Sequence, residues 1–275
     1  EFCVLHSSLP FFSVACPSFN LMNIQQPISR EQGDTNQSEL RQAYHLQLDD
    51  DTKRLIEEDA SCFLHQALST PVMNVLSKTE GPFIYDLQGR AYLDLHGNGV
   101  HNAGFSNPYV IGKVMAQLQQ SLAFTPRRYT NTAAISLAKK IIEIAPEGLN
   151  RVLFCPGGSE AIEMAVMLAK QVTGKWKTLS YWDSYHGTGF QSSALGGEEH
   201  FSIGQGPMVP GAFHVEFPNY YRNPWGLTNT EDIDAEYLRQ IRIILQRNPD
   251  MAALVAEPIS ATPVVPSVSY WKEVQ

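Results

Sequence analysis

The amino-acid sequence predicts an α/β fold with a mixed, mainly parallel sheet and helices on both of its faces. From Arg151 onward, short apolar runs alternate with helical patterns, which is typical of a largely parallel sheet covered by helices. The first apolar run leads through a glycine turn into a helix that opens on Ser159. A hydrophobic fraction of 43% provides enough apolar material for a core.

Residues 1–21 are expected to be vector-derived or upstream sequence. Cys3 to Leu21 contains no Lys or Arg, and Pro10 and Pro17 interrupt its apolar run. A secretory signal has a basic first region and a continuous apolar core, so a degenerate export signal is the less favoured alternative. Met22 is the expected natural start.

Residues 22–129 are predicted to form an N-terminal arm and a small-domain segment. Ile24 to Leu48 is polar and Gln-rich, which favours a flexible or loosely docked arm. Asp50 to Gln66 predicts a helix whose first turn is acidic. Val75 to Leu95 predicts short strands with a turn at Gln88-Gly89.

Two further helices are predicted before the alternating region. Pro108 to Leu122 has proline at its first position, where a missing N–H costs little. Asn131 to Ile144 is the second helix. A boundary is placed near Thr130, so that residues 130–275 belong to a separate, larger domain.

A candidate phosphate site lies at Gly157-Gly158-Ser159, between a short buried strand that starts at Arg151 and a helix that runs to Lys170. A helix start carries unpaired N–H groups and partial positive charge, and small residues let an anion approach them. The alternative is an ordinary turn in which glycine supplies unusual backbone angles and serine caps the helix.

Two other phosphate-binding motifs are excluded at this turn. A nucleotide P-loop needs Gly-Lys-Ser/Thr, whereas the chain continues into Ser159-Glu160. A dinucleotide fingerprint needs a third glycine, which is missing here. The helix itself is apolar nearly all round, which predicts a buried central helix with Met164 as core filler. Cys155, at the end of the preceding strand, is likewise predicted to be a core residue.

Two later strand ends carry side chains that suit a flat ligand. Lys177 to Trp182 predicts a strand that leads to Tyr185-His186, and Met251 to Ala256 predicts a strand that leads to Glu257. The carboxyl ends of parallel strands meet at one edge of a sheet, where α/β proteins bind ligands. A phosphate cradle, an aromatic face and a carboxylate together suit a planar, phosphorylated, aromatic cofactor.

From about Pro71 to Gln275, the chain resembles the class III aminotransferases, which are fold-type I enzymes dependent on pyridoxal 5'-phosphate (PLP). Five motifs carry the resemblance in the right order: Tyr85-Asp86 to Leu95, Gly97-Asn98-Gly99-Val100, Gly157-Gly158-Ser159-Glu160-Ala161, Tyr185-His186-Gly187 and Glu257-Pro258-Ile259. The resemblance implies the PLP-dependent transferase type I fold, with residues 130–275 as the N-terminal part of its large PLP-binding domain.

The resemblance also implies roles for the motif residues. Gly157, Gly158 and Ser159 are expected to bind the PLP phosphate, Tyr185 to stack on the pyridine ring, and Glu257 to order groups near the ring's phenolic oxygen. His186 is expected to shape the pocket or to be a structural residue behind it. The Schiff-base lysine of the family is expected beyond Gln275, so this chain is interpreted as an N-terminal portion without its catalytic lysine.

Arg127 and Arg128 are candidate substrate-binding residues. In the family their region reaches toward the active site, often across a dimer interface, and guanidinium groups match carboxylate and phosphoryl oxygens well. The alternative is a surface loop whose arginines meet water or a neighbouring acid.

Three functions remain open. Transamination of a small primary amine or amino acid comes first, because it is the commonest activity in the family that the chain resembles. An ammonia-lyase or phospho-lyase acting on a small aminophosphonate or phosphorylated amine comes second, because Ser260 to Pro266 lacks the glycine and glutamate that many transaminases have there. A truncated, non-catalytic relative is the third.

The composition narrows the partners. The net charge of −8 disfavours nucleic acid, and no apolar run is long enough to span a membrane. The four cysteines have no metal-site spacing, so no metal is expected. A cytoplasmic location is expected because nothing requires an oxidising compartment, and the resemblance implies a homodimer.

Overall fold

The computed structural model describes residues 38–63, 72–97, 100–120, 122, 124–126, 128–260 and 264–275. The predictions for residues 1–21, for the first part of the arm and for Arg127 lie outside these residues. The chain divides between Met115 and Ala116 into two compact units, each described by itself. The boundary expected near Thr130 stays a prediction about domains.

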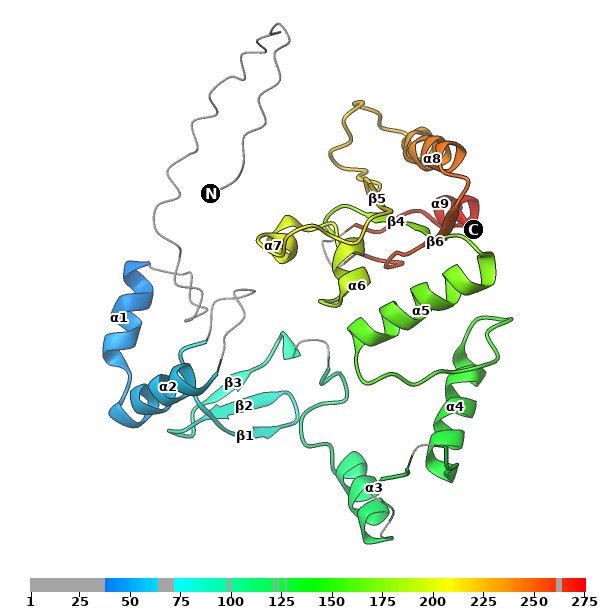
Figure 1. The fold of residues 1–275 in the computed structure, drawn as a ribbon. Coiled ribbons are helices and arrows are strands. Elements are labelled where there is room, and N and C mark those ends of the chain that lie inside the picture. The colour runs from blue at the N-terminus through cyan, green and yellow to red at the C-terminus, as the bar shows by residue number, and fades with distance from the viewer. Residues whose placement is uncertain are drawn as a thin grey trace, which may run out of the picture. The chain divides into compact units, whose positions relative to one another are not determined.

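The first unit begins with two capped helices (Figure 1). Helix α1 spans Glu39–Gln47 and helix α2 spans Asp50–Cys62, and the side chains of Ser38 and Asp49 accept N–H groups of their first turns. Such caps satisfy donors that a helix start leaves unpaired. The predicted flexible or loosely docked arm up to Leu48 thus contains a capped helix, α1, which buries no residue.

A three-stranded antiparallel sheet follows, in the order β1-β2-β3. Its strands are Leu76–Glu80, Phe83–Asp86 and Ala91–Leu93. The predicted strands between Val75 and Leu95 are confirmed, and Gly89 has the positive φ of 76° that the predicted turn needs. Helix α3, Pro108–Gln119, crosses the boundary between the units.

The second unit contains a parallel sheet of three strands, in the order β5-β4-β6. Its helices are α4 (Thr132–Ile144), α5 (Gly158–Thr173), α6 (Phe190–Leu195), α7 (Glu199–Ser202), α8 (Thr230–Arg247) and α9 (Val268–Val274), and its strands are β4 (Lys177–Tyr181), β5 (Ala212–Val215) and β6 (Met251–Leu254). The predicted parallel pairing is confirmed.

Helices cover both faces of this sheet, with α5 and α6 on one side and α8 and α9 on the other (Figure 1). Successive side chains of a strand point to opposite faces. The Ser180 hydroxyl accordingly donates to the carbonyl oxygen of Leu195 in α6 at 2.6 Å, while the Tyr181 and Tyr270 hydroxyls meet at 2.9 Å on the α9 side. The main core cluster lies on that side and includes Leu179, Val215, Ile233, Tyr237, Leu238 and Ile241.

Three predictions of burial around the glycine turn are wrong. Residues 151–155 form no strand, and Leu153 is 70% exposed, because within the described chain no strand pairs with them. Cys155 is half-buried rather than in the core. Helix α5 buries only Val166, and Met164 is 41% exposed, because α5 packs mainly against α6 and β6 among the described elements.

No helix of the described residues is both long and apolar enough to span a membrane.

Candidate functional site

Five of the six predicted cofactor-binding residues line one cavity of about 680 Å³ in the second unit. The cavity is formed by the start of α5, the segment after β4 and the segment after β6. It is lined by Gly158, Ser159, Ala161, Ile162, Tyr185, His186, Gly187, Val255, Ala256, Glu257 and Pro258. Gly157 immediately precedes these residues, and the exposed Arg128 does not line the cavity.

The start of α5 leaves room for an anion. Gly157 is the N-cap residue, and having no side chain it makes no side-chain cap, so the first-turn N–H groups receive no hydrogen bond from an N-cap side chain. No atom lies within 4 Å of the place where a Cβ on Gly158 would stand. Open space, exposed N–H groups and the positive end of the helix dipole fit a phosphate group.

The Ser159 side chain is held by the segment after β4. Its Oγ accepts the N–H of Thr188 at 3.1 Å. A hydroxyl has one proton to donate and two lone pairs, so this contact uses a lone pair and leaves the proton available. Gly187 has φ of 124°, and a Cβ there would collide with Ser159. Only glycine fits this approach of the two segments.

Tyr185 presents an aromatic ring to the cavity. Asp183, with a positive φ of 56°, turns the chain after β4, and the Ser184 hydroxyl donates to the carbonyl oxygen of Tyr181 at 2.6 Å. The ring of Tyr185 is 44% exposed and contacts Phe201, with centroids 4.5 Å apart. Tyr185 therefore packs against Phe201 and is partly exposed at the cavity.

His186 is only 8% exposed, and its Nε2 has no hydrogen-bond partner among the described residues. Burial lowers the pKa of its imidazole, an effect that the nearby Glu257 carboxylate partly opposes. His186 is therefore neutral at pH 7. His186 lines the cavity, but its Nε2 is a buried polar atom without a partner among the described residues, which folded proteins rarely leave.

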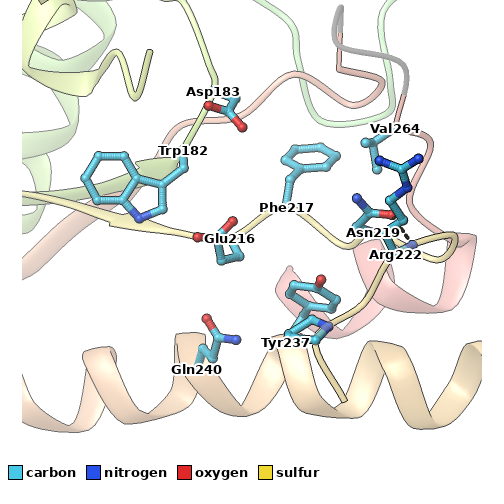
Figure 2. Close-up of a pocket in the computed structure, with 10 residues that line it drawn as sticks. Trp182, Asp183, Glu216, Phe217, Asn219, Arg222, Tyr237, Gln240 and Val264 are labelled. Atoms are coloured by element: carbon cyan, nitrogen blue, oxygen red, sulfur yellow. Dashed lines mark hydrogen bonds between the residues drawn. The ribbon is translucent and has the colours of Figure 1, made fainter. Parts of the chain in front are cut away.

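A second hollow, of about 350 Å³, lies beside α8 (Figure 2). Aromatic rings of Trp182, Phe217 and Tyr237 and the carboxylates of Asp183 and Glu216 line it. It shares no lining residue with the cavity at α5. No residue of the candidate phosphate site lines this second hollow.

Sequence reasoning missed Glu163 and Thr188, which hold the walls of the cavity together. Glu163 follows Ser159 by four residues and therefore lies on the same face of α5. That spacing was the available signal, but the partners of Glu163 lie in α6, which the sequence analysis did not predict.

The sequence of the chain matches a known protein family. The family described as Aminotransferase class-III matches residues 65–275. The chain belongs to the class III aminotransferases. It is 37% identical over 261 residues to the (R)-1-hydroxy-2-aminoethylphosphonate ammonia-lyase of Vibrio splendidus, covering 90% of this chain and 54% of that protein.

Other class III relatives are less similar. The hypotaurine/taurine–pyruvate aminotransferase of Paracoccus denitrificans is 30% identical over 222 residues, which cover 77% of this chain and 48% of that protein. The ω-transaminase of Pseudomonas jessenii in complex with PMP aligns with a TM-score of 0.72 and 28% identity, over 80% of this chain and 52% of that one. The chain thus spans about half the length of the relatives it matches, and its fold is that of the PLP-dependent transaminases.

Proposed function

We propose that this class III chain binds PLP in the cavity at α5 and takes part in chemistry at the amine carbon of a small primary amine. The observation that carries the proposal is the juxtaposition of the uncapped α5 start, the Tyr185 ring and the Glu257 carboxylate around one cavity. When bound, the cofactor supplies an electron sink for the amine carbon.

The residues around the cavity are proposed to contact different parts of the cofactor. Gly157 and Gly158 leave the backbone N–H groups open to the phosphate, and Ser159 adds its hydroxyl proton. Tyr185 supports one face of the ring. Glu257 orders the polar groups near the phenolic oxygen, and the neutral, buried His186 shapes the wall behind Tyr185. The lysine of the reaction is proposed to lie outside this chain.

Elimination of ammonia from a small aminophosphonate is the reaction that we favour. The chain is 37% identical to an aminophosphonate ammonia-lyase over 90% of its length, and Ser260 to Pro266 lacks the glycine and glutamate expected of many transaminases. A phosphonate dianion suits paired guanidinium groups. Because Arg128 does not line the cavity of its own chain, Arg127 and Arg128 are proposed to bind the phosphonate across a dimer interface.

Transamination is the second candidate, supported by the similarity to the hypotaurine/taurine–pyruvate aminotransferase. A non-catalytic relative is the third. We also propose a homodimer, as expected for a family whose active sites are built from two subunits, in the cytoplasm. The molar mass in solution from light scattering tests the dimer.

One assay separates the three candidates. The longest product of the source gene is incubated with PLP and (R)-1-hydroxy-2-aminoethylphosphonate, with and without pyruvate, and ammonia and new amino acids are measured. Ammonia release that does not need pyruvate identifies the lyase. A new amino acid that forms only with pyruvate identifies the transaminase and overturns the lyase. Neither product, in a protein that binds no PLP, supports the non-catalytic relative.

A further inference from the structure

We propose that Glu163 is a positioning residue for the phosphate cradle. Through its carboxylate it holds the segment from Thr188 to Ser192 against α5, and this keeps the Thr188 N–H on the hydroxyl of Ser159. The inference rests on the proposed binding of PLP and deepens it. Glu163 does not line the cavity, so it acts through Ser159 and not on the cofactor.

The Glu163 carboxylate binds the start of α6 directly. Its Oε1 accepts the backbone N–H groups of Gln191 and Ser192, each at 2.8 Å. Hydrogen bonds to an ionised acceptor are stronger than neutral ones, and negative charge is favoured at the positive end of a helix. The half-buried carboxylate therefore binds α6 more firmly than a neutral acceptor would.

Other contacts on the same face of α5 define the fit. Lys170, two turns further along the helix, donates to the side-chain oxygen of Gln191 at 2.5 Å. A Cβ on Gly189 would stand only 2.5 Å from Glu163 Oε1, so the backbone of the segment approaches the carboxylate closely. The segment is thus seated on α5 at one position.

The contacts of Glu163 lie only a few residues from the phosphate cradle. Ser159 and Glu163 are one helical turn apart on α5, and they bind successive parts of the same segment, at Thr188 and at Gln191. Without the Glu163 carboxylate, the N–H groups of Gln191 and Ser192 lose their partner, and the segment is held less tightly against α5. The Ser159 hydroxyl then loses the Thr188 N–H, the contact that fixes the position of its oxygen at the start of α5.

Comparison of PLP with pyridoxal, which lacks the phosphate, isolates this effect. The dissociation constants of both are measured for the wild type, Glu163→Ala and Glu163→Gln in the longest product of the source gene. Loss of a charge-assisted contact is worth roughly tenfold in affinity. We therefore expect Glu163→Ala to weaken PLP binding about tenfold while leaving pyridoxal binding within about twofold.

Glu163→Gln keeps an oxygen that can accept the same N–H groups, so it is expected to restore most of the preference for PLP. The matched control is Glu236→Ala in α8, a half-buried helical glutamate whose ion pair with Arg239, at 2.8 Å, lies within its own helix. This control is expected to leave both constants unchanged. If Glu163→Ala does not fold, as judged by circular dichroism, Glu163→Asp is compared in its place.

Two results overturn the inference alone: a preference for PLP over pyridoxal that survives in Glu163→Ala, or equal losses for both ligands, as a merely structural role would give. A wild type that binds neither ligand, or binds both equally, instead overturns the proposed PLP site, and the role of Glu163 falls with it.

Discussion

Gly187 is where the two walls of the candidate site come closest. Its φ of 124° favours glycine, and a Cβ at this position would overlap Ser159. We expect Gly187→Ala to lower the free energy of unfolding by about 2–4 kcal/mol, from backbone strain plus the collision. Urea denaturation measures the change.

Gly226→Ala is the matched control for that substitution. Gly226 also has a positive φ, of 66°, but nothing lies within 4 Å of a Cβ there. It should therefore show backbone strain alone, about 1–2 kcal/mol. Equal costs at the two positions would mean that the close approach of Gly187 to Ser159 contributes nothing.

His186 makes stability depend on pH. In the unfolded chain its imidazole takes up a proton near the ordinary pKa of 6.5, whereas burial lowers the pKa in the folded protein. The unfolded state then binds more protons below that pH, so stability is greatest above it and falls as the pH drops toward the folded pKa. The largest slope from one such group is about 1.4 kcal/mol per pH unit.

His186→Gln is expected to flatten this pH dependence. Urea denaturation at about pH 7.5, 6.5 and 5.5 brackets the titration of histidine. His214 stays in the variant, and burial also lowers its pKa, so part of the slope remains. Parallel curves for the wild type and the variant would show that His186 does not titrate between the folded and unfolded states.

Strand β4 and helix α9 are joined by a pair of buried hydroxyls. Tyr181 and Tyr270 meet at 2.9 Å, and burial raises the pKa of both phenols. Tyr270→Phe leaves the Tyr181 hydroxyl without this partner, which costs about 1–3 kcal/mol. The double variant with Tyr181→Phe should cost less than the sum of the single variants, in a double-mutant cycle of denaturation free energies. Strictly additive costs would show that the two hydroxyls do not interact.

The regular elements near the site could largely be predicted from the sequence. Strand β6 is an apolar run followed by polar residues, β4 leads into a polar, Gly-rich segment, and α3, α4 and α9 carry local start signals. Parallel pairing then brings Tyr185, His186 and Glu257 to one edge of the sheet. The failures involve packing partners that are distant in sequence: an apolar segment such as 151–155 pairs with no strand in the described chain.

The polar network around Asp234 shows the same limit. Asp234 lies in the polar first turns of α8, a pattern typical of an exposed residue, yet it is buried. Its carboxylate accepts from Tyr220 at 2.6 Å and from Ser267 at 2.5 Å, and burial together with Asp234 raises the pKa of Tyr220 to about 12. Partners that lie 14 and 33 positions away leave no local signal.

At the scale of the whole molecule, the cavity at α5 belongs to the second unit alone, because all its lining residues follow Ala116. PLP at about 100 times its dissociation constant should stabilise the state that binds it by about 2.7 kcal/mol. We expect PLP to slow amide hydrogen exchange in α5 and at residues 184–188, and far less in β1 to β3. Uniform protection of both units, or none, would contradict this assignment.

The alternation along β4 has a consequence for how the chain finds its fold. Ser180 is bound to α6 and Tyr181 to α9, so neighbouring residues serve opposite layers. A slip of one residue would turn the tyrosine toward α6 and the serine into the apolar cluster beneath α8. A shifted register of this central strand would thus lose contacts in both helix layers at once. The two layers together therefore select the native register as the sheet assembles.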